Sequence, residues 1–214
     1  FLTMMYIVPV NGFILADAGL PIDAVITATA LITILATLFS ALWSNTPIAM
    51  SVGMGLNAYF SYGLVLGMKI PWETALGIVF LSGILFVILS LTNFRVWIMT
   101  SIPMSLRRAI SAGIGSFIAF IGLKQMGMIV SNDATLVGLG DFSNSNVLLG
   151  VLGLILAFSF YAYRLKGAFI LSIAITSCTA WFFGLGELPS SIISMPASIS
   201  PIFLQLDILS AISL

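Results

Sequence analysis

The sequence predicts an all-α protein that crosses a lipid bilayer several times. Hydrophobic residues make up 60% of the chain and charged residues only 7%, and the mean hydropathy is +1.21. Average soluble domains carry about 25% charged residues, so this composition excludes an ordinary soluble domain. Residues 24–68 contain no charged side chain. A run of this length suffices for two helical crossings, because each crossing needs ~20 apolar residues.

The charge balance and the residue types exclude several classes of function. Seven basic and seven acidic residues cancel, which removes any basis for nucleic-acid binding. The chain has no histidine, and its single cysteine, Cys178, has no internal disulfide partner. No nucleophile is paired with a base, and no residues have metal-ligand spacing. We therefore predict no enzyme activity, no catalytic residues, no metal site and no cofactor.

The membrane-spanning helices are predicted from apolar segments that meet or approach ~20 residues in length. Seven such segments follow one another along the chain: 1–16, 22–43, 48–68, 72–94, 106–129, 146–163 and 167–185. The first of them begins inside an apolar run, so we interpret it as the remainder of a clipped first span.

Turn-forming residues separate the first four segments. Residues 17–23 form a polar turn, and Asp23 is placed to cap the second helix. Residues 45–47 end in a proline that ends the second helical crossing, and residues 69–71 end the third crossing in the same way.

The second half of the chain is divided by longer polar stretches. Residues 101–103 introduce a short amphipathic piece, 104–110, before the fifth span. Residues 131–146 form the longest polar loop, which is rich in turn residues and is expected to be exposed. Three prolines between residues 187 and 201 exclude a spanning helix there. Residues 187–214 are therefore predicted to form an interfacial connector.

The basic residues predict the orientation in the membrane. If the spans alternate, Lys69 and Lys124 fall on one side, and five basic residues fall on the other: Arg95, Arg107, Arg108, Arg164 and Lys166. The side with five is expected to face the cytoplasm. We expect the chain to lie in the cytoplasmic membrane. With seven crossings, a second copy following this one would insert upside down, as inverted-repeat transporters require.

The third apolar segment carries the candidate binding site. Its middle contains Gly53, Gly55 and Asn57, which weaken a helix and are tolerated at membrane depth only where they pack in protein or line a cavity. In secondary transporters an interruption of this kind marks a substrate site near the bilayer midplane. We expect an extended segment followed by a half-helix that starts at Ala58.

Two interpretations of the side chains in this segment stay open. Asn57 either pairs with the edge of a flat ligand through its amide or only caps the half-helix. Tyr59 and Phe60 either stack on a ring face of the ligand or only pack in the protein interior.

The segment Gly53–Phe60, which reads GMGLNAYF, closely resembles a motif of the adenine/guanine/hypoxanthine permeases, the AzgA-like branch of the nucleobase–cation symporters. Residues 14–19, 105–124 and 203–207 resemble other parts of the same proteins. The resemblance covers essentially the whole chain.

The chain departs from the family pattern at two places. Ser51 and Val52 stand where the family usually has Ala-Pro, and Gly12 stands where it usually has Pro. The first departure would soften the break in the third span, but neither removes the glycines or Asn57.

The resemblance implies a fourteen-span transporter built from two inverted seven-span repeats, of which this chain supplies the first. Spans 1–4 of the core domain would then occupy residues 1–100, and spans 5–7 of the gate domain would occupy residues 101–186. The connector, residues 187–214, would lead toward the missing second repeat.

The resemblance also implies transport of purine bases together with protons. The expected partners are a purine nucleobase, protons, the lipid bilayer and the missing C-terminal repeat. Asn57 is carried over as the substrate-binding residue, and the rest of its segment completes the predicted substrate-binding set: Gly53, Met54, Gly55, Leu56, Ala58, Tyr59 and Phe60. No carboxylate lies deep in a predicted span, so the proton-coupling residues are expected outside this chain. The oligomeric state stays open, with a homodimer among the alternatives.

Other functions on the same sequence also stay open. The alternative is a transporter of the same architecture for uracil, xanthine or a small anion. The segment around Asn57 favours purines over these substrates by resemblance alone. A pore is disfavoured because it would need a continuous polar stripe along a helix, whereas polarity here is concentrated at one break. A non-transporting membrane scaffold is the remaining alternative.

Overall fold

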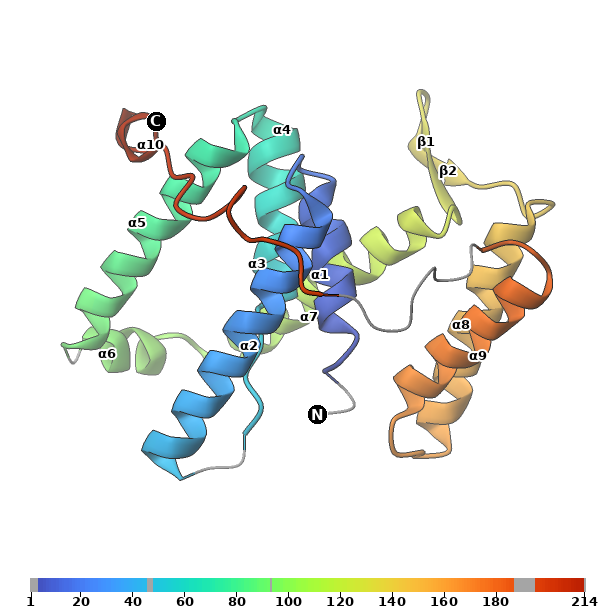
Figure 1. The fold of residues 1–214 in the computed structure, drawn as a ribbon, viewed down its shortest axis with the longest axis horizontal. Coiled ribbons are helices and arrows are strands. Elements are labelled where there is room, and N and C mark those ends of the chain that lie inside the picture. The colour runs from blue at the N-terminus through green and yellow to red at the C-terminus, as the bar shows by residue number, and fades with distance from the viewer. Residues whose placement is uncertain (1–3, 46–47, 93, 187–194, 214) are drawn as a thin grey trace. The chain divides into compact units, whose positions relative to one another are not determined.

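The computed structural model describes residues 4–45, 48–92, 94–186 and 195–213. These residues form ten α-helices, one π-helix and one β-hairpin (Figure 1). The helices of the first half are α1 (Ile7–Ala16), α2 (Ile22–Ser44), α3 (Met54–Ala58), η1 (Tyr59–Val65), α4 (Leu66–Met68) and α5 (Trp72–Ser90). The remaining elements are α6 (Phe94–Ser101), α7 (Met104–Gln125), β1 (Ile129–Asn132), β2 (Leu136–Leu139), α8 (Ser145–Ala162), α9 (Ala168–Phe182) and α10 (Ile208–Ser213).

The helices have the lengths and composition of a polytopic membrane protein. Among the described residues, α2, α5, α7 and α8 are long and apolar enough to cross a bilayer. Helices α1 and α9 are also apolar but shorter. Each of the seven predicted spans therefore corresponds to a helical region of the structure, with α3, η1 and α4 together occupying part of the third.

The fourth predicted span, 72–94, is shorter than expected. Helix α5 ends at Ser90, and a separate helix, α6, starts at Phe94. The hydroxyl of Thr92 donates to the Leu89 carbonyl over 2.9 Å, and the Phe94 N–H donates to that hydroxyl over 3.4 Å. A threonine that bonds to nearby backbone groups in this way competes with the helix, which explains the break.

The region before α7 was wrongly predicted as a separate piece. Residues 104–110 are the first turns of α7, which runs without interruption to Gln125. The helix ends before residue 129 because Gly127 adopts a positive φ of 78°, a conformation that glycine tolerates and that closes the last turn.

The hairpin β1–β2 corrects the prediction of an all-α fold and of a polar loop over residues 131–146. Strands β1 and β2 pair antiparallel, with Ile129 opposite Leu139. The Asn132 side-chain oxygen accepts from the N–H groups of Ala134 and Thr135 over 2.9 and 3.2 Å, which fixes the turn. Two short apolar runs flanking an Asn-Asp pair were the sequence signal for this hairpin.

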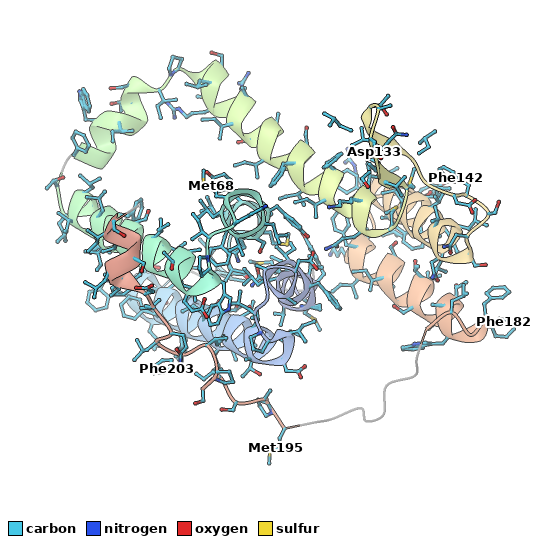
Figure 2. All side chains as sticks on the ribbon, turned by 90° about the horizontal axis from the view of Figure 1, so that it is seen from above. Met68, Asp133, Phe142, Phe182, Met195 and Phe203 are labelled. Atoms are coloured by element: carbon cyan, nitrogen blue, oxygen red, sulfur yellow. The ribbon has the colours of Figure 1, made fainter. Side chains whose placement is uncertain are left out.

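The predicted connector, 187–214, lies partly outside the described residues, which resume at residue 195. Residues 195–207 contain no helix, and the short helix α10 follows. Figure 2 labels Met195 and Phe203 along this stretch. Residues 195–213 contain no helix long enough to span a bilayer, and the role of residues 187–214 as a connector stays a prediction.

The described chain forms two compact units. Among the described residues, one unit contains residues 4–6, 117–186 and 195, and the other contains residues 7–45, 48–92, 94–116 and 196–213. The second unit has a buried apolar cluster around Ala18, Leu20, Val25, Phe60 and Ala75, which joins the end of α1 to α2, η1 and α5. The division of the chain at residue 100 into core and gate domains stays a prediction.

Candidate functional site

The backbone of residues 48–68 changes character at Gly53. Residues 48–53 are not helical, and Gly53 has an extended conformation with φ −85° and ψ 96°. A helix starts at Met54, and the N–H groups of Leu56 and Asn57 both donate to the Gly53 carbonyl over 3.1 and 3.2 Å. The half-helix thus begins four residues earlier than the expected start at Ala58, because Gly55 is accommodated within its first turn.

The non-helical residues 48–53 are held along α2 by threonine hydroxyls. The Thr37 hydroxyl donates to the Met50 carbonyl over 3.2 Å and accepts from the Met50 N–H over 3.0 Å. The hydroxyls of Thr33 and Ser51 lie 3.2 Å apart in a hydrogen bond. These contacts satisfy backbone groups that a helix would otherwise satisfy, as a membrane interior requires.

The helix that starts at Met54 contains a π-helical segment. From Tyr59 to Val65 the helix has the wider π geometry, with the Leu66 N–H donating to the Ser61 carbonyl. Segments of this kind are rare and often lie at functional sites. Ser61 is fully buried here, and its hydroxyl has no hydrogen-bond partner among the described residues.

Asn57 lies at the end of a chain of three polar side chains from three helices. Its Nδ2 donates to Oδ1 of Asn11 in α1 over 2.6 Å. The Nδ2 of Asn11 in turn donates to the Thr29 hydroxyl in α2 over 2.9 Å. Asn11 is 1% exposed and Thr29 is 3% exposed, whereas Asn57 is only partly buried. The chain therefore leads from the interior to a more accessible amide.

Asn57 lines a small, mostly apolar cavity of about 220 Å³. Its lining residues come from α1, α2, α3, α5 and three non-helical stretches: Asn11, Leu15, Leu20, Val25, Ala28, Thr29, Ile32, Val52, Asn57, Leu76 and Ile202. Pockets for drug-sized ligands span ~300–1,000 Å³, so this cavity suits a smaller ligand. An apolar lining with a few convergent polar groups is the usual composition of a small-molecule site.

The structure distributes the predicted site residues unevenly around this cavity. Asn57 lines it, but Ala58 and Phe60 are buried, and Phe60 (5% exposed) belongs to the apolar cluster. Tyr59 is 53% exposed. Of the alternatives left open for the two aromatic rings, interior packing fits the place of Phe60.

The other predicted residues flank Asn57 without lining the cavity. Gly53 and Leu56 are exposed, and Met54 and Gly55 are partly buried. Within the described residues, no group of three or more His, Cys, Asp or Glu side chains is arranged to hold a metal ion.

Sequence reasoning missed Asn11 and Thr29. A polar amide in the middle of an apolar segment was the signal for Asn11. The signal for Thr29 was its spacing, because Thr29, Thr33 and Thr37 are four residues apart and fall on one face of α2. All three hydroxyls form hydrogen bonds with residues outside α2.

Comparison with known proteins places the chain in a family. Residues 1–213 match the Permease family. The chain is 47% identical, over its whole length and 49% of the relative, to a putative permease of Methanocaldococcus jannaschii. It is 42% identical to the guanine/hypoxanthine permease PbuO of Bacillus subtilis, covering 92% of this chain and 46% of the relative. It is 39% identical to the adenine permease AdeQ of Escherichia coli, covering 100% of this chain and 48% of the relative.

The chain spans about half the length of the curated relatives it matches. The match nevertheless extends along essentially all of the chain and includes the segment around Asn57. On this evidence the chain belongs to the permease family of membrane proteins.

Proposed function

We propose that this chain is the first repeat of a transporter that carries purine nucleobases across the cytoplasmic membrane, and that Asn57 contacts the base. One observation carries the proposal. Asn57 lines a small apolar cavity, and its Oδ1 accepts no hydrogen bond from the described residues. An amide with unused hydrogen-bonding capacity in an apolar cavity can pair with the polar edge of a flat base.

In this proposal residues 48–68 form one broken crossing of the membrane. The non-helical residues 48–53 would cross part of the bilayer, and the helix from Met54 to Met68 would complete the crossing. Hydrogen bonds from Thr33 and Thr37 to residues 50 and 51 support this arrangement, because they keep a non-helical backbone satisfied in an apolar setting. Figure 2 labels Met68 at the far end of this helix.

The complete transporter would contain two inverted repeats of seven spans. The first core-domain spans would fall in residues 1–100, and the first gate-domain spans in residues 101–186. The length of the relatives supports this view, because each is about twice as long as the chain. The cavity lining contains no titratable residue among the described ones, so proton coupling is assigned to residues of the second repeat.

The names of the relatives support purines as the substrates. The B. subtilis relative is a guanine/hypoxanthine permease, and the E. coli relative is an adenine permease. Uracil, xanthine or a small anion remains the alternative on the same architecture.

The test is competitive uptake by the full-length protein in cells that lack their own purine transporters. We expect adenine, guanine or hypoxanthine to compete with a radiolabelled purine, and uracil to compete only weakly. Dissipating the proton gradient should abolish accumulation. Competition by uracil alone, or no uptake of any purine, would contradict the proposal.

A further inference from the structure

The polar groups of the cavity form one connected chain. Asn11, Thr29 and Asn57 are the polar residues among its described lining, and the two hydrogen bonds between them measure 2.9 and 2.6 Å. Any polar contact that a side chain of the described lining makes with a ligand therefore involves a residue whose orientation depends on the other two.

This chain of hydrogen bonds can run in either of two directions. A threonine hydroxyl both donates and accepts, and the two ends of an asparagine amide occupy equivalent positions. In one direction Asn11 donates to Thr29, and Asn57 donates to Asn11. In the reverse direction the Thr29 hydroxyl donates to the Asn11 oxygen, and Asn11 donates to the Asn57 oxygen. The heavy atoms occupy the same positions in both.

The direction decides what Asn57 presents to the cavity. An amide edge holds an acceptor beside a donor, and a half-turn of the amide exchanges their places. Bases with an amino group at position 6, such as adenine, present a donor beside a ring-nitrogen acceptor. Bases with an oxo group there, such as hypoxanthine and guanine, present an acceptor beside a ring N–H donor. When this edge of the base lies against Asn57 in one fixed pose, the two classes of base therefore require opposite orientations of the Asn57 amide.

We propose that Asn11 and Thr29 are positioning residues that allow Asn57 to reverse its amide, so that one site accepts both 6-amino and 6-oxo purines. This inference rests on the proposed function and adds the device that sets base selectivity. Asn11 and Thr29 act through Asn57 and need not contact the base.

The burial of Asn11 makes Asn11 and Asn57 reverse their amides together. Asn11 is almost fully buried, and an unpaired amide there would cost ~1–3 kcal/mol. Asn57 and Asn11 therefore turn together. The close approach of α1 and α2 holds the pair within reach, because a Cβ on Gly12 would lie only 2.6 Å from Ile26 Cγ1.

Two substitutions fix the chain of hydrogen bonds in opposite directions. In Asn11→Asp an ionised carboxylate only accepts hydrogen bonds, so the Thr29 hydroxyl and the Asn57 amide both donate to it, which holds the Asn57 nitrogen toward α1. In Thr29→Val no hydroxyl faces Asn11. A buried carbonyl oxygen tolerates the loss of a partner better than an N–H, so Asn11 turns its oxygen to the valine and donates to Asn57.

The experiment measures the ratio of dissociation constants for adenine and hypoxanthine in purified full-length protein, with uptake of both bases as a second readout. We expect each variant to change the ratio at least tenfold from wild type, or ~1.4 kcal/mol, and the two changes to have opposite signs. Thr29→Ser, which keeps the hydroxyl, should retain the wild-type ratio.

A general loss of packing would weaken the binding of adenine and hypoxanthine alike and would leave the ratio of their dissociation constants unchanged. Changes of the same sign, or a ratio within roughly twofold of wild type in either variant, would overturn the inference. A wild-type protein that binds neither base would instead contradict the proposed function, so the two failures are distinguishable.

Discussion

Two pairs of neighbouring helices in this chain use polar side chains in different ways. Between α1 and α2, Asn11 bonds to Thr29 side chain to side chain and leads on to Asn57. Between α8 and α9, the Ser172 hydroxyl donates to the backbone carbonyl of Gly153 over 2.7 Å. Within α9, the Thr176 hydroxyl donates to the Ser172 carbonyl over 2.8 Å.

The difference separates polar groups that hold helices together from polar groups that recognise a ligand. A hydroxyl that donates to a backbone carbonyl uses its single O–H donor to stabilise the fold, as is common where helices pack in membranes. The chain of hydrogen bonds that ends at Asn57 leaves an acceptor and a donor of that amide unused. The cavity against α8 and α9 is larger, at about 460 Å³, than the one that Asn57 lines. A choice by size alone would therefore pass over the cavity proposed here as the binding site.

The first test of this difference removes one polar group from each of the two helix pairs. Asn57→Ala deletes the amide that faces the cavity, and we expect the KM for purine uptake to rise tenfold to hundredfold, or ~1.4–2.7 kcal/mol. Ser172→Ala removes a hydroxyl that only joins α8 to α9, and KM should stay within about twofold of wild type. Uptake kinetics at matched expression levels measure both.

An unchanged KM in Asn57→Ala would remove Asn57 from the binding site and leave it with the alternative role of a helix cap. A rise in KM for Ser172→Ala as large as that for Asn57→Ala would instead contradict the distinction between the two helix pairs.

The second prediction compares glycines at the two helix contacts. A Cβ at Gly12 would lie 2.6 Å from Ile26 Cγ1, a branch atom close to the α2 backbone. A Cβ at Gly153 would lie 3.0 Å from the Thr176 hydroxyl, the end of a side chain. We expect Gly12→Ala to destabilise the protein by ~1–3 kcal/mol through overpacking. Gly153→Ala should be close to neutral, because the helix propensity of alanine offsets its contact by up to ~1 kcal/mol.

Thermal unfolding of the purified full-length protein, with purine binding as a second readout, measures this difference. Gly12→Ala should also weaken binding, since it separates Asn11 from Thr29. Equal stability of the two variants would show that the α1–α2 contact has more room than the distance to Ile26 indicates.

Hydropathy predicted the order of the helices because it depends only on long apolar segments. It did not predict the hairpin β1–β2, which is fixed by short-range bonds from Asn132 that a search for membrane spans passes over. The start of the half-helix at Met54 was missed for a different reason. Helix propensity penalises Gly55, but at ~1 kcal/mol the penalty is small enough for neighbouring contacts to override.

The candidate site divides in the same way. Asn57 was found because it interrupts an apolar span beside two glycines. Asn11 and Thr29 were not found, because their role depends on a contact between two helices, and the sequence does not give the register of that contact. The structure supplies it through the hydrogen bond that joins their side chains over 2.9 Å.

The last and smallest expected effect compares two helix caps, one in each unit. Asn144 caps α8 by accepting from the Asn146 N–H over 2.9 Å, and Asp207 caps α10 by accepting from the Ser210 N–H over 3.1 Å. Hydrogen bonds from the side chain and then the backbone of Ser210, with a smaller one from Thr74, lower the pKa of Asp207 from its ordinary value of 3.8. The cap therefore contributes its full stability above pH 3.8 and loses it as the pH falls through the lowered value.

Amide hydrogen exchange, corrected for the intrinsic rate at each pH, tests this cap in the full-length protein. Protection of α10 should fall below about pH 3.8, whereas protection of the first turn of α8 should not, because the neutral Asn144 has no proton to gain over this range. The variant Asp207→Asn should keep a capping oxygen but lose the pH dependence. If α8 and α10 lost protection at the same pH, a common unfolding step rather than the Asp207 carboxylate would be responsible, and the contrast between the two caps would fail.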